Sequence, residues 1–396
     1  MKLLILHNRY QLAGGEDKVM EAEKNLLEAN GHDVLLLEEN NLRIANLWQK
    51  FVVSGEAIYS VAAKRRVQTE IYRFRPDIVH VHNFFPLLSP SVYDACYIAG
   101  VPVVQTLHNY RLGCPKAMPF RDSKICEDCI GKLIPFPSVV HGCYRHSRIQ
   151  SLVVASMTTL HKFRGTWHQR VDAYIALTQF QKDKMIQAGL PAAKIYVKPN
   201  FVDSNSNLEI NHQRQKYLLF VGRLSEEKGM ITLINCYIHN QLSIPLKVVG
   251  DGPLRQELQQ QVIQAGYENL IEFLGYQDKL VVNQLMIDAQ LLIFPSIWYE
   301  GFPVTIIEAF AASLPVVVPK LGSMAEIVED KVNGLHYAAG KYQDLAEKIN
   351  LAINQPELLA AMGRNARLAY EKKYSPAVNY QELMAIYQRV IAAKNS

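Results

Sequence analysis

The chain has 396 residues, of which 49% are hydrophobic and 20% charged, and its formal net charge is +5. This length predicts about two domains, and the composition is that of an ordinary globular protein. No apolar run approaches the roughly 20 residues that a membrane-spanning helix needs, and the N-terminal MKLLILHNRY lacks the long apolar core of a signal peptide. We therefore expect a cytoplasmic protein.

The charge is unevenly distributed along the chain. Residues 1–200 hold 25 Lys and Arg against 17 Asp and Glu, whereas the remainder holds 17 against 20. A basic first half predicts a surface for an anionic partner, and anionic lipid, a phosphorylated acceptor and nucleic acid all remain open at this point. The alternative is a set of solvated helix faces, such as the one that carries Lys64, Arg65 and Arg66 in a predicted helix over 55–75.

Strand and helix patterns alternate along the chain, which favours parallel sheets covered by helices on both faces. In the first half, Gly14 and Gly15 follow the first strand, where a backbone without side chains can approach a phosphate or a sugar. His82 and His108 end two later strands, at the carboxyl edge where open α/β sheets place ligands. The elements predicted for this half are strand 2–7, helix 16–30, strand 33–37, helix 55–75, strands 77–82 and 101–108, helix 147–165, strand 173–177, helix 178–188 and strand 195–200.

Residues 109–146 interrupt this alternation, because they are rich in Cys, Pro and Gly and predict an irregular loop. The loop holds Cys114, Cys126, Cys129 and Cys143, so that a C-x2-C pair is flanked by one cysteine on each side, at 12 and 14 residues. Four thiolates suit a structural zinc, which would also offset the entropy of ordering so long a loop. An iron–sulfur cluster and four small apolar side chains are the alternatives, whereas a cytosolic location argues against disulfides.

The polar stretch 202–215 separates this half from a second run of alternating elements. The terminal helix carries an apolar stripe that requires a surface, which we expect the N-terminal domain to provide. The predicted division is an N-terminal domain over 1–200, a linker over 201–215, a second domain over 216–375 and the terminal helix over 376–396. The elements predicted for the second domain are strand 217–222, a helix beginning near 229, strand 245–250, helix 252–266, strand 269–274, helix 278–288, a strand and a helix within 291–312, and strand 314–319.

The second domain is organised around residues 291–312, where a short buried strand and a helix flank a loop that carries Glu300. Because proline suits the first turn of a helix, we expect the helix to begin at Pro303 and to offer free N–H groups, including that of Val304. Such groups and the helix dipole together favour a phosphate. Glu308 lies further along the helix, and a carboxylate beside a phosphate suggests a nucleotide with its ribose hydroxyls. The alternative is a buried strand–helix unit with two solvated glutamates.

Two cations follow the first strand of the second domain. In GRLSEEKG, Arg223 and Lys228 lie five residues apart. Placed opposite an anion-binding helix, they would neutralise a diphosphate without a metal ion, although surface charges that cap the next helix are the simpler interpretation. Gly250 in VGDGPL and Tyr276 in FLGYQ follow the next two strands, where backbone groups can contact a base.

Taken together, these segments resemble the C-terminal domain of retaining glycosyltransferases of family four, which have the GT-B fold. The resemblance rests on GRLSEEKG, VGDGPL, FLGY, the Glu-x7-Glu pair of YEGFPVTIIEA and GSMAEIVEDKVNGL, in this order and at normal spacing. HNRYQLAGGED, HVHNFFP and TLHNYR are similar to the family's acceptor domain, so the resemblance covers nearly the whole chain. It implies two Rossmann-like parallel-sheet domains that face each other across a cleft, with the terminal helix crossing back to the first domain.

The resemblance also implies roles for residues at matching positions. Arg223 and Lys228 would bind the donor diphosphate and stabilise the leaving group. Glu308 would hold the ribose hydroxyls, Glu300 would contact the donor sugar, and His108 would face the sugar near the reacting centre. The remaining donor-binding positions are Gly14, Gly15, Gly250, Tyr276, Gly301, Phe302, Pro303 and Val304. The family often has a second glycine where this chain has Pro303, which removes one backbone donor that the family pattern would use.

The implied reaction moves a sugar from a UDP- or GDP-sugar to a glycan or a lipid-linked acceptor, with retention and without a catalytic metal ion. Glu300 and Glu308 are not read as a glycosidase pair, because the two cations imply a phosphate leaving group. The alternatives are a GT-B epimerase or phosphorylase and a catalytically silent sugar-nucleotide-binding protein. We see no nucleic-acid recognition motif and expect no nucleic acid as a partner, whereas the basic N-terminal domain predicts peripheral contact with the inner face of an anionic membrane.

Overall fold

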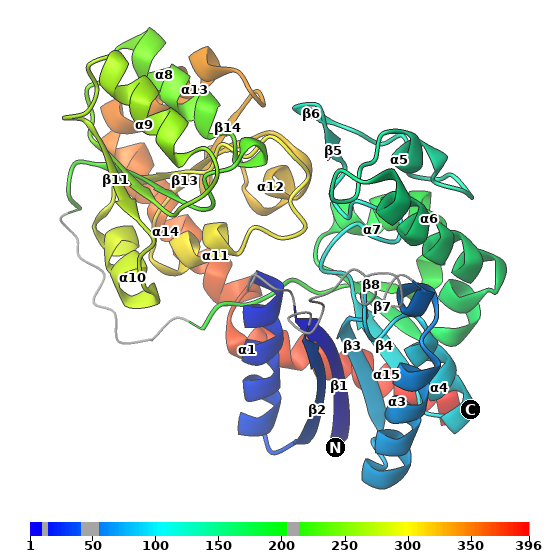
Figure 1. The fold of residues 1–396 in the computed structure, drawn as a ribbon. Helices are drawn as coiled ribbons and strands as arrows, with labels where there is room; N and C mark the ends of the chain where they lie inside the picture. The colour runs from blue at the N-terminus through cyan, green and yellow to red at the C-terminus, as the bar shows by residue number, and fades with distance from the viewer. Residues whose placement is uncertain (10–14, 41–54, 204–213, 396) are drawn as a thin grey trace. The chain divides into compact units, whose positions relative to one another are not determined.

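The protein is described by a computed structural model, which covers residues 1–9, 15–40, 55–203 and 214–395. The chain forms two compact units (Figure 1). Unit 1 comprises Met1–Pro119, Cys126–Asn200 and Pro376–Ser396, and unit 2 comprises Phe120–Ile125 and Phe201–Ser375. Each unit contains a six-stranded sheet in which neighbouring strands run parallel. The prediction of two parallel-sheet α/β units is confirmed.

The sheet of unit 1 has the strand order β2-β1-β3-β4-β7-β8. Leu3 to Leu6 of β1 are all fully buried, as expected for a central parallel strand with both faces covered. The strands are β1 (Lys2–Arg9), β2 (Asp33–Asn40), β3 (Ile78–Asn83), β4 (Val103–Thr106), β7 (Ala173–Ala176) and β8 (Ile195–Val197). The α-helices are α1 (Gly15–Ala29), α3 (Val61–Phe74), α4 (Ser91–Ala99), α5 (Phe136–Val140), α6 (Arg148–Phe163), α7 (Gln179–Gln187) and α15 (Pro376–Asn395).

The sheet of unit 2 has the strand order β11-β10-β9-β12-β13-β14. Successive side chains of a strand point to opposite faces of the sheet, so each strand contributes residues to two apolar cores. Leu219 and Leu292 enter one core, and Leu218 and Leu291 enter the other. The strands are β9 (Leu218–Val221), β10 (Leu246–Val249), β11 (Ile271–Gly275), β12 (Leu291–Ile293), β13 (Val316–Pro319) and β14 (Gly334–Tyr337). The helices are α8 (Met230–Asn240), α9 (Arg255–Gln264), α10 (Lys279–Asp288), α11 (Val304–Ala311), α12 (Gly322–Ile327), α13 (Tyr342–Asn354) and α14 (Pro356–Lys373).

The C-terminal helix α15 packs on unit 1, as the fold prediction required. Leu383 and Tyr387 are fully buried in a cluster that also contains Leu3 and Ile5 of β1. The apolar stripe seen in the sequence therefore covers the sheet of the first unit. None of the helices in the described ranges is long and apolar enough to span a membrane.

The loop over 109–146 contains more regular structure than the sequence suggested. Strands β5 (Phe120–Arg121) and β6 (Lys124–Ile125) form a short antiparallel hairpin, and α5 follows within the same loop. Asp122 and Ser123 connect the two strands with φ angles of 52° and 59°, the positive values that a tight hairpin turn demands. The prediction of a loop without regular elements was wrong here, because Asp-Ser is a weak turn signal.

Candidate active site

Four loops of unit 2 that carry predicted donor-binding residues lie along one edge of its sheet. Strands β11, β10, β9 and β12 are consecutive neighbours and run parallel, so their carboxyl ends meet at that edge. The loops after them hold Tyr276, Gly250, the Arg223–Lys228 segment and Glu300, respectively. Arg223 is exposed, and the Tyr276 side chain is 78% exposed. The structure thus gathers at one edge residues that the sequence separates by up to about 80 positions.

Lys228 and Glu300 form an ion pair at this edge. The Lys228 Nζ atom lies 2.7 Å from Glu300 Oε1, and the same oxygen accepts hydrogen bonds from Ser296 Oγ at 2.7 Å and from Trp298 Nε1 at 2.9 Å. Only 6% of Glu300 is exposed. The hydroxyl of Ser323 donates to the backbone carbonyl of Glu300 at 2.8 Å. The carboxylate is therefore held in one position, with a lysine that can face an anion beside it.

Two glycines allow the loops at this edge to pack closely. Gly250 has φ +129°, and a Cβ atom there would lie 1.9 Å from the carbonyl oxygen of Gly222. Gly229, directly after Lys228, has φ +70°, and a Cβ atom there would lie 2.0 Å from the carbonyl oxygen of Pro295. Any side chain at either position would push neighbouring loops apart. Gly250 thus has a steric role in the fold, and the ligand contact that the sequence suggested stays a prediction.

The helix after Glu300 begins one residue later than predicted. Helix α11 starts at Val304, and Pro303 precedes it with φ −79° and ψ 85°. These angles describe an inverse γ-turn, in which the Val304 N–H donates to the Phe302 carbonyl at 3.0 Å. The prediction of a free N–H at Val304 was therefore wrong, because the fixed φ of proline favours this turn. Glu308 is half-buried on the same helix.

In unit 1, histidines lie at the carboxyl ends of three neighbouring strands: His7 in β1, His82 in β3 and His108 beyond β4. The predicted strand over 101–108 was too long, since β4 ends at Thr106. His82 Nδ1 and His108 Nε2 lie 3.0 Å apart, and the two rings stack at 22° with their centroids 5.2 Å apart. Burial lowers the pKa of His82 to about 4 and holds the pKa of His108 well below its ordinary value. Both imidazoles are therefore neutral at pH 7.

A cavity lies beside these histidines at the ends of β3 and β4. Its lining includes His82, His108, Asn109 and Arg111. The guanidinium carbon of Arg111 lies 4.2 Å from the centre of the Phe85 ring, so this cation is held against an aromatic face. Of the two glycines predicted to close the site, Gly15 is the first residue of α1, and Gly14 lies outside the described residues. A Cβ atom at Gly15 would meet nothing within 4 Å, so the backbone there is accessible.

Comparisons with known proteins agree with this geometry. A family model described as Glycosyltransferase Family 4 matches residues 13–206, and one described as Glycosyl transferases group 1 matches residues 204–369. Together they span both units. The chain belongs to this family of glycosyltransferases.

Curated relatives are about a quarter identical to this glycosyltransferase over the aligned residues. An uncharacterized glycosyltransferase of Methanocaldococcus jannaschii is 25% identical over 323 residues, which cover 79% of this chain and 75% of the relative. The amylovoran biosynthesis glycosyltransferase AmsK of Erwinia amylovora is 27% identical over 229 residues, which cover 54% of this chain and 56% of AmsK.

Solved structures show the fold. HepE of Anabaena, crystallised in complex with UDP, has a TM-score of 0.69 at 22% identity and covers 98% of this chain and 100% of HepE. A glycosyltransferase of Rickettsia africae has a TM-score of 0.72 at 16% identity, with 98% of each chain covered. The predicted GT-B fold is confirmed.

One acidic residue that interacts with Asn109 and Arg111 of the first-unit cavity was missed in the sequence. Glu16 follows Gly15, and its Oε1 atom is buried without a hydrogen-bond partner among the described residues. Burial raises the pKa of Glu16 to about 8, although the charge of Arg111 and a hydrogen bond with Asn109 act in the opposite direction. The position directly after the two glycines was the available signal. A carboxyl group that gains or loses its proton near pH 8 beside Asn109 and Arg111 is suited to proton exchange with a bound ligand.

We expect stability to fall as Glu16 ionises. The folded state binds the Glu16 proton more tightly than the unfolded state, whose pKa is near 4.5. The stabilising contribution is thus complete below pH 4.5 and is lost as the pH rises through 8. Between pH 5 and 9 the free energy of unfolding should fall by on the order of 3–4 kcal/mol more in the wild type than in Glu16→Gln. Urea titrations at both pH values measure this, with the exposed Glu28→Gln on the same helix as control. Equal pH dependence in the wild type and Glu16→Gln would contradict the assignment.

Proposed function

We propose that this glycosyltransferase moves a sugar from a nucleoside-diphosphate sugar to a glycan or lipid-linked acceptor with retention of anomeric configuration. The observation that carries the proposal is the Lys228–Glu300 pair at the carboxyl edge of the second sheet, next to exposed Arg223 and the α11 helix. Departure of a nucleoside diphosphate builds negative charge on phosphate oxygens, and fixed cations stabilise that charge. Glu300, held by three donors, is suited to accept hydrogen bonds from sugar hydroxyls.

The relatives support the class of donor and acceptor. HepE was crystallised with UDP, with UDP and glucose, and with UDP-glucose, which favours a UDP-sugar over a GDP-sugar. AmsK is named for amylovoran biosynthesis, and a Klebsiella pneumoniae relative, 23% identical over 350 residues, is encoded in a cps region. Both names favour a role in polysaccharide biosynthesis.

Nucleotide binding tests the proposal directly. Glu308→Ala should weaken UDP binding about tenfold, because a contact with the ribose exists whether or not a sugar is attached. Glu300→Ala should leave the affinity for UDP unchanged and weaken the affinity for the UDP-sugar. Isothermal titration calorimetry with UDP, GDP and UDP-sugars measures both, with the exposed Glu257→Ala on α9 as control.

Two outcomes of this titration, and two outcomes of an activity assay with the wild type, would count against the proposal. Unchanged UDP affinity in Glu308→Ala removes the ribose assignment, and the absence of binding by either nucleotide removes the donor class. Binding without transfer to any acceptor glycan, in the presence of intact protein, favours the silent sugar-nucleotide-binding protein. Release of an epimerised sugar favours the epimerase.

We also propose one structural zinc in the loop over 109–146 and no metal in the reaction. Cys114 and Cys129 are buried, and none of the four cysteines of the loop is in a disulfide. Burial and, to a smaller extent, the other three thiols together raise the pKa of Cys114 to about 12, which indicates that the four share one neighbourhood. A backbone hydrogen bond from Lys116 acts in the opposite direction, as it does on a zinc-bound thiolate. In the described residues, the group of ligand atoms that lie within 4.8 Å of one another belongs to Glu23, His80 and His82, and not to the cysteines. The four sulfurs would therefore have to move closer together to bind one zinc ion.

Metal analysis tests both parts of this proposal. Protein purified without a His tag should contain about one zinc per chain, and Cys126→Ser should lose it, whereas Cys96→Ala, a buried cysteine outside the loop, should retain it. Initial rates should persist when excess EDTA is present during the assay only. Metal-free, folded wild-type protein would contradict the zinc, and activity that Mg²⁺ restores after EDTA would contradict a metal-independent reaction.

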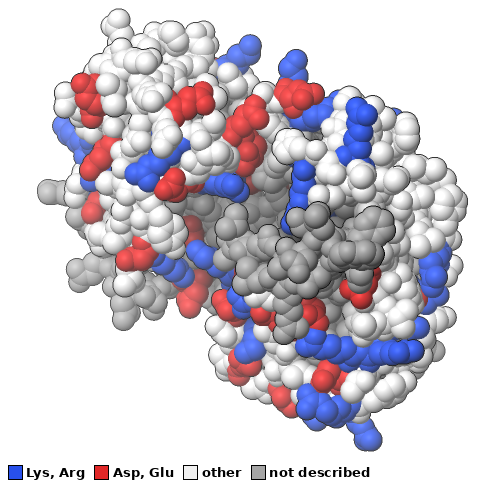
Figure 2. Space-filling view, in the orientation of Figure 1, with Lys and Arg blue, Asp and Glu red and all other residues white. Residues whose placement is uncertain are grey.

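Peripheral contact with an anionic membrane stays a proposal that rests on the charge count of residues 1–200. On the face shown in Figure 2, basic and acidic side chains are interspersed. Several basic residues of unit 1 are paired, as in Arg73 with Glu70 and Arg66 with Glu39. These pairs reduce the charge that a lipid surface would meet.

A further inference from the structure

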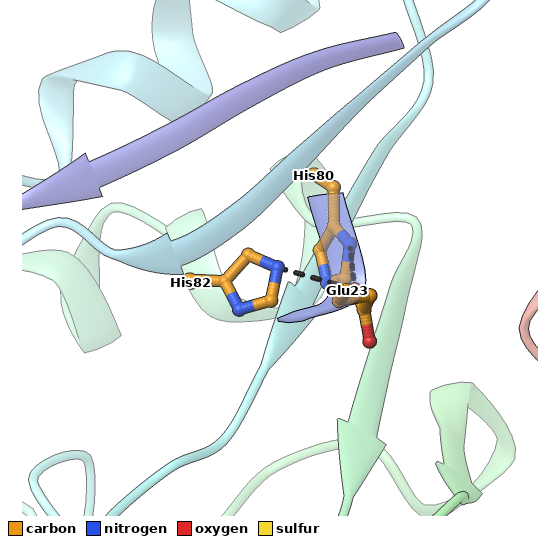
Figure 3. A group of neighbouring side chains, drawn as sticks. All are labelled: Glu23, His80 and His82. Carbon is orange, nitrogen blue, oxygen red and sulfur yellow. Dashed lines mark ion pairs between the residues drawn. The ribbon is translucent and has the colours of Figure 1, made fainter. Parts of the chain in front are cut away.

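A buried cluster of charged and polar side chains lies beneath the first-unit cavity. His80 and His82 are two residues apart in β3, so their side chains share one face of the strand. Glu23 of α1 covers that face, and Figure 3 shows both imidazoles beside its carboxylate. Glu23 Oε1 lies 3.1 Å from His80 Nδ1 and 3.2 Å from His82 Nε2. All three residues are at most 3% exposed.

The charge of Glu23 is balanced by a lysine. The ammonium of Lys198, a residue only 1% exposed, lies 3.1 Å from Glu23 Oε2 and donates to Asn379 Oδ1 at 3.0 Å. Burial alone would raise the pKa of Glu23, but the charge of Lys198 and the two imidazoles hold it well below its ordinary value. Glu23 is therefore ionised.

The same lysine bears on whether Glu23, His80 and His82 bind a metal. Their ligand atoms lie within 4.8 Å of one another, which is close enough for one ion. The Lys198 ammonium 3.1 Å from the carboxylate would repel a divalent cation at that distance. The hydroxyl of Tyr387 also lies 2.6 Å from His80 Nδ1, the atom that would have to coordinate the ion. We therefore interpret the group as an ion-pair network.

The ionised carboxylate determines which nitrogen of His82 carries the proton. His82 Nε2 and Glu23 Oε1 lie 3.2 Å apart, and neither atom has a hydrogen-bond partner among the described residues, so the carboxylate acts on this nitrogen through its charge. A neutral imidazole has one N–H, and a buried carboxylate favours that N–H on its own side. His82 Nδ1 is then an acceptor. Because His108 Nε2 lies 3.0 Å from His82 Nδ1, the proton of this contact belongs to His108 Nε2.

We infer that Glu23 and His82 are positioning residues that hold His108 in its Nε2–H tautomer, so that its Nδ1 is a hydrogen-bond acceptor at the first-unit cavity. An acceptor there suits a substrate hydroxyl group, which rests on the proposed function, whereas the tautomer does not.

The tautomer is measured on the wild-type protein. The protein is labelled with ¹⁵N-histidine, and its two-bond ¹H–¹⁵N correlation spectrum separates protonated from bare ring nitrogens for each of the 12 histidines. The signal that disappears in His108→Gln identifies His108. We expect a protonated Nε2 and a bare Nδ1 at pH 7. A protonated Nδ1 in the folded wild type would overturn the inference, and His108→Gln is the one variant that must fold, for the assignment.

Variants test whether Glu23 is responsible. Glu23→Gln with Lys198→Met removes both buried charges together, and His108 should then show a mixture of tautomers, with kcat about tenfold lower and UDP affinity unchanged. His80→Gln is the matched control, since His80 contacts the same carboxylate but not His108, and the tautomer should persist. A pure Nε2–H tautomer in the double variant would also overturn the inference.

The two proposals fail differently. A wild-type protein that binds no nucleotide but shows the Nε2–H tautomer contradicts the function alone. An active enzyme with a protonated Nδ1 contradicts the tautomer alone.

Discussion

Lys228→Met should lower kcat about 100- to 1,000-fold, the range observed when one fixed donor to a developing anion is removed. The lysine lies on the loop after β9, with its ammonium 2.7 Å from Glu300. Methionine keeps most of the side-chain length but has no charge for the leaving diphosphate. Glu300 keeps its hydrogen bonds from Ser296 and Trp298, so the carboxylate should stay in place. The fall in kcat then measures the effect of the missing cation and not that of a displaced glutamate.

Steady-state kinetics with the best UDP-sugar from calorimetry measure this effect. Lys279→Met is the matched control, because Lys279 is exposed on α10 of the same unit. Arg223→Met should lower kcat less, about tenfold, because Arg223 is exposed and a solvated charge acts more weakly. A wild-type kcat in Lys228→Met, with an unchanged unfolding midpoint, would remove the lysine from the reaction.

The sequence predicted the loops that carry the donor site, but not how their residues pair. Arg223, Lys228 and Glu300 stand out because each follows a buried strand within a recognisable segment. The contact between Lys228 and Glu300 spans 72 residues. It exists because β9 and β12 are neighbours in the sheet. The hydrophobic pattern of a strand predicts the strand itself but not which strands lie beside it. Pro303 shows a local limit, since the same fixed φ suits both a first helical turn and the γ-turn that the structure has.

The charged network of unit 1 was invisible in the sequence. From the sequence alone, Glu23 is one of several glutamates in an amphipathic helix, and Lys198 is expected to be a surface lysine after a strand. They meet across 175 residues, and Lys198 meets Asn379 of the C-terminal helix across 181. Their burial depends on α15 covering the first sheet, which the apolar stripe predicted without indicating the polar residues beneath it. His82 and His108 were singled out separately, but their contact required β3 and β4 to be neighbours.

Lys198→Met should destabilise the protein by about 3–5 kcal/mol, the cost of removing one partner of a buried ion pair. Lys198 is 1% exposed and Glu23 is 2% exposed, so water cannot replace the missing ammonium. The effect should depend on pH. Because the folded pKa of Glu23 lies below its ordinary value of 4.5, the stabilisation from its ionisation is present above pH 4.5 and is lost as the pH falls through the folded pKa. The penalty of Lys198→Met should therefore shrink in acid, where Glu23 becomes neutral.

Urea unfolding followed by circular dichroism measures this penalty at pH 7 and in acid. Lys18→Met on the exposed face of α1 is the control and should change stability by less than about 0.5 kcal/mol. The double variant Lys198→Met with Glu23→Gln should recover much of the loss, because no uncompensated charge remains buried, and the double-mutant cycle isolates the coupling between the two residues. If Lys198→Met were as stable as the control at pH 7, Glu23 would have to be neutral in the folded protein. It would then no longer hold the proton of His82 on Nε2, and the argument for the His108 tautomer would fail with it.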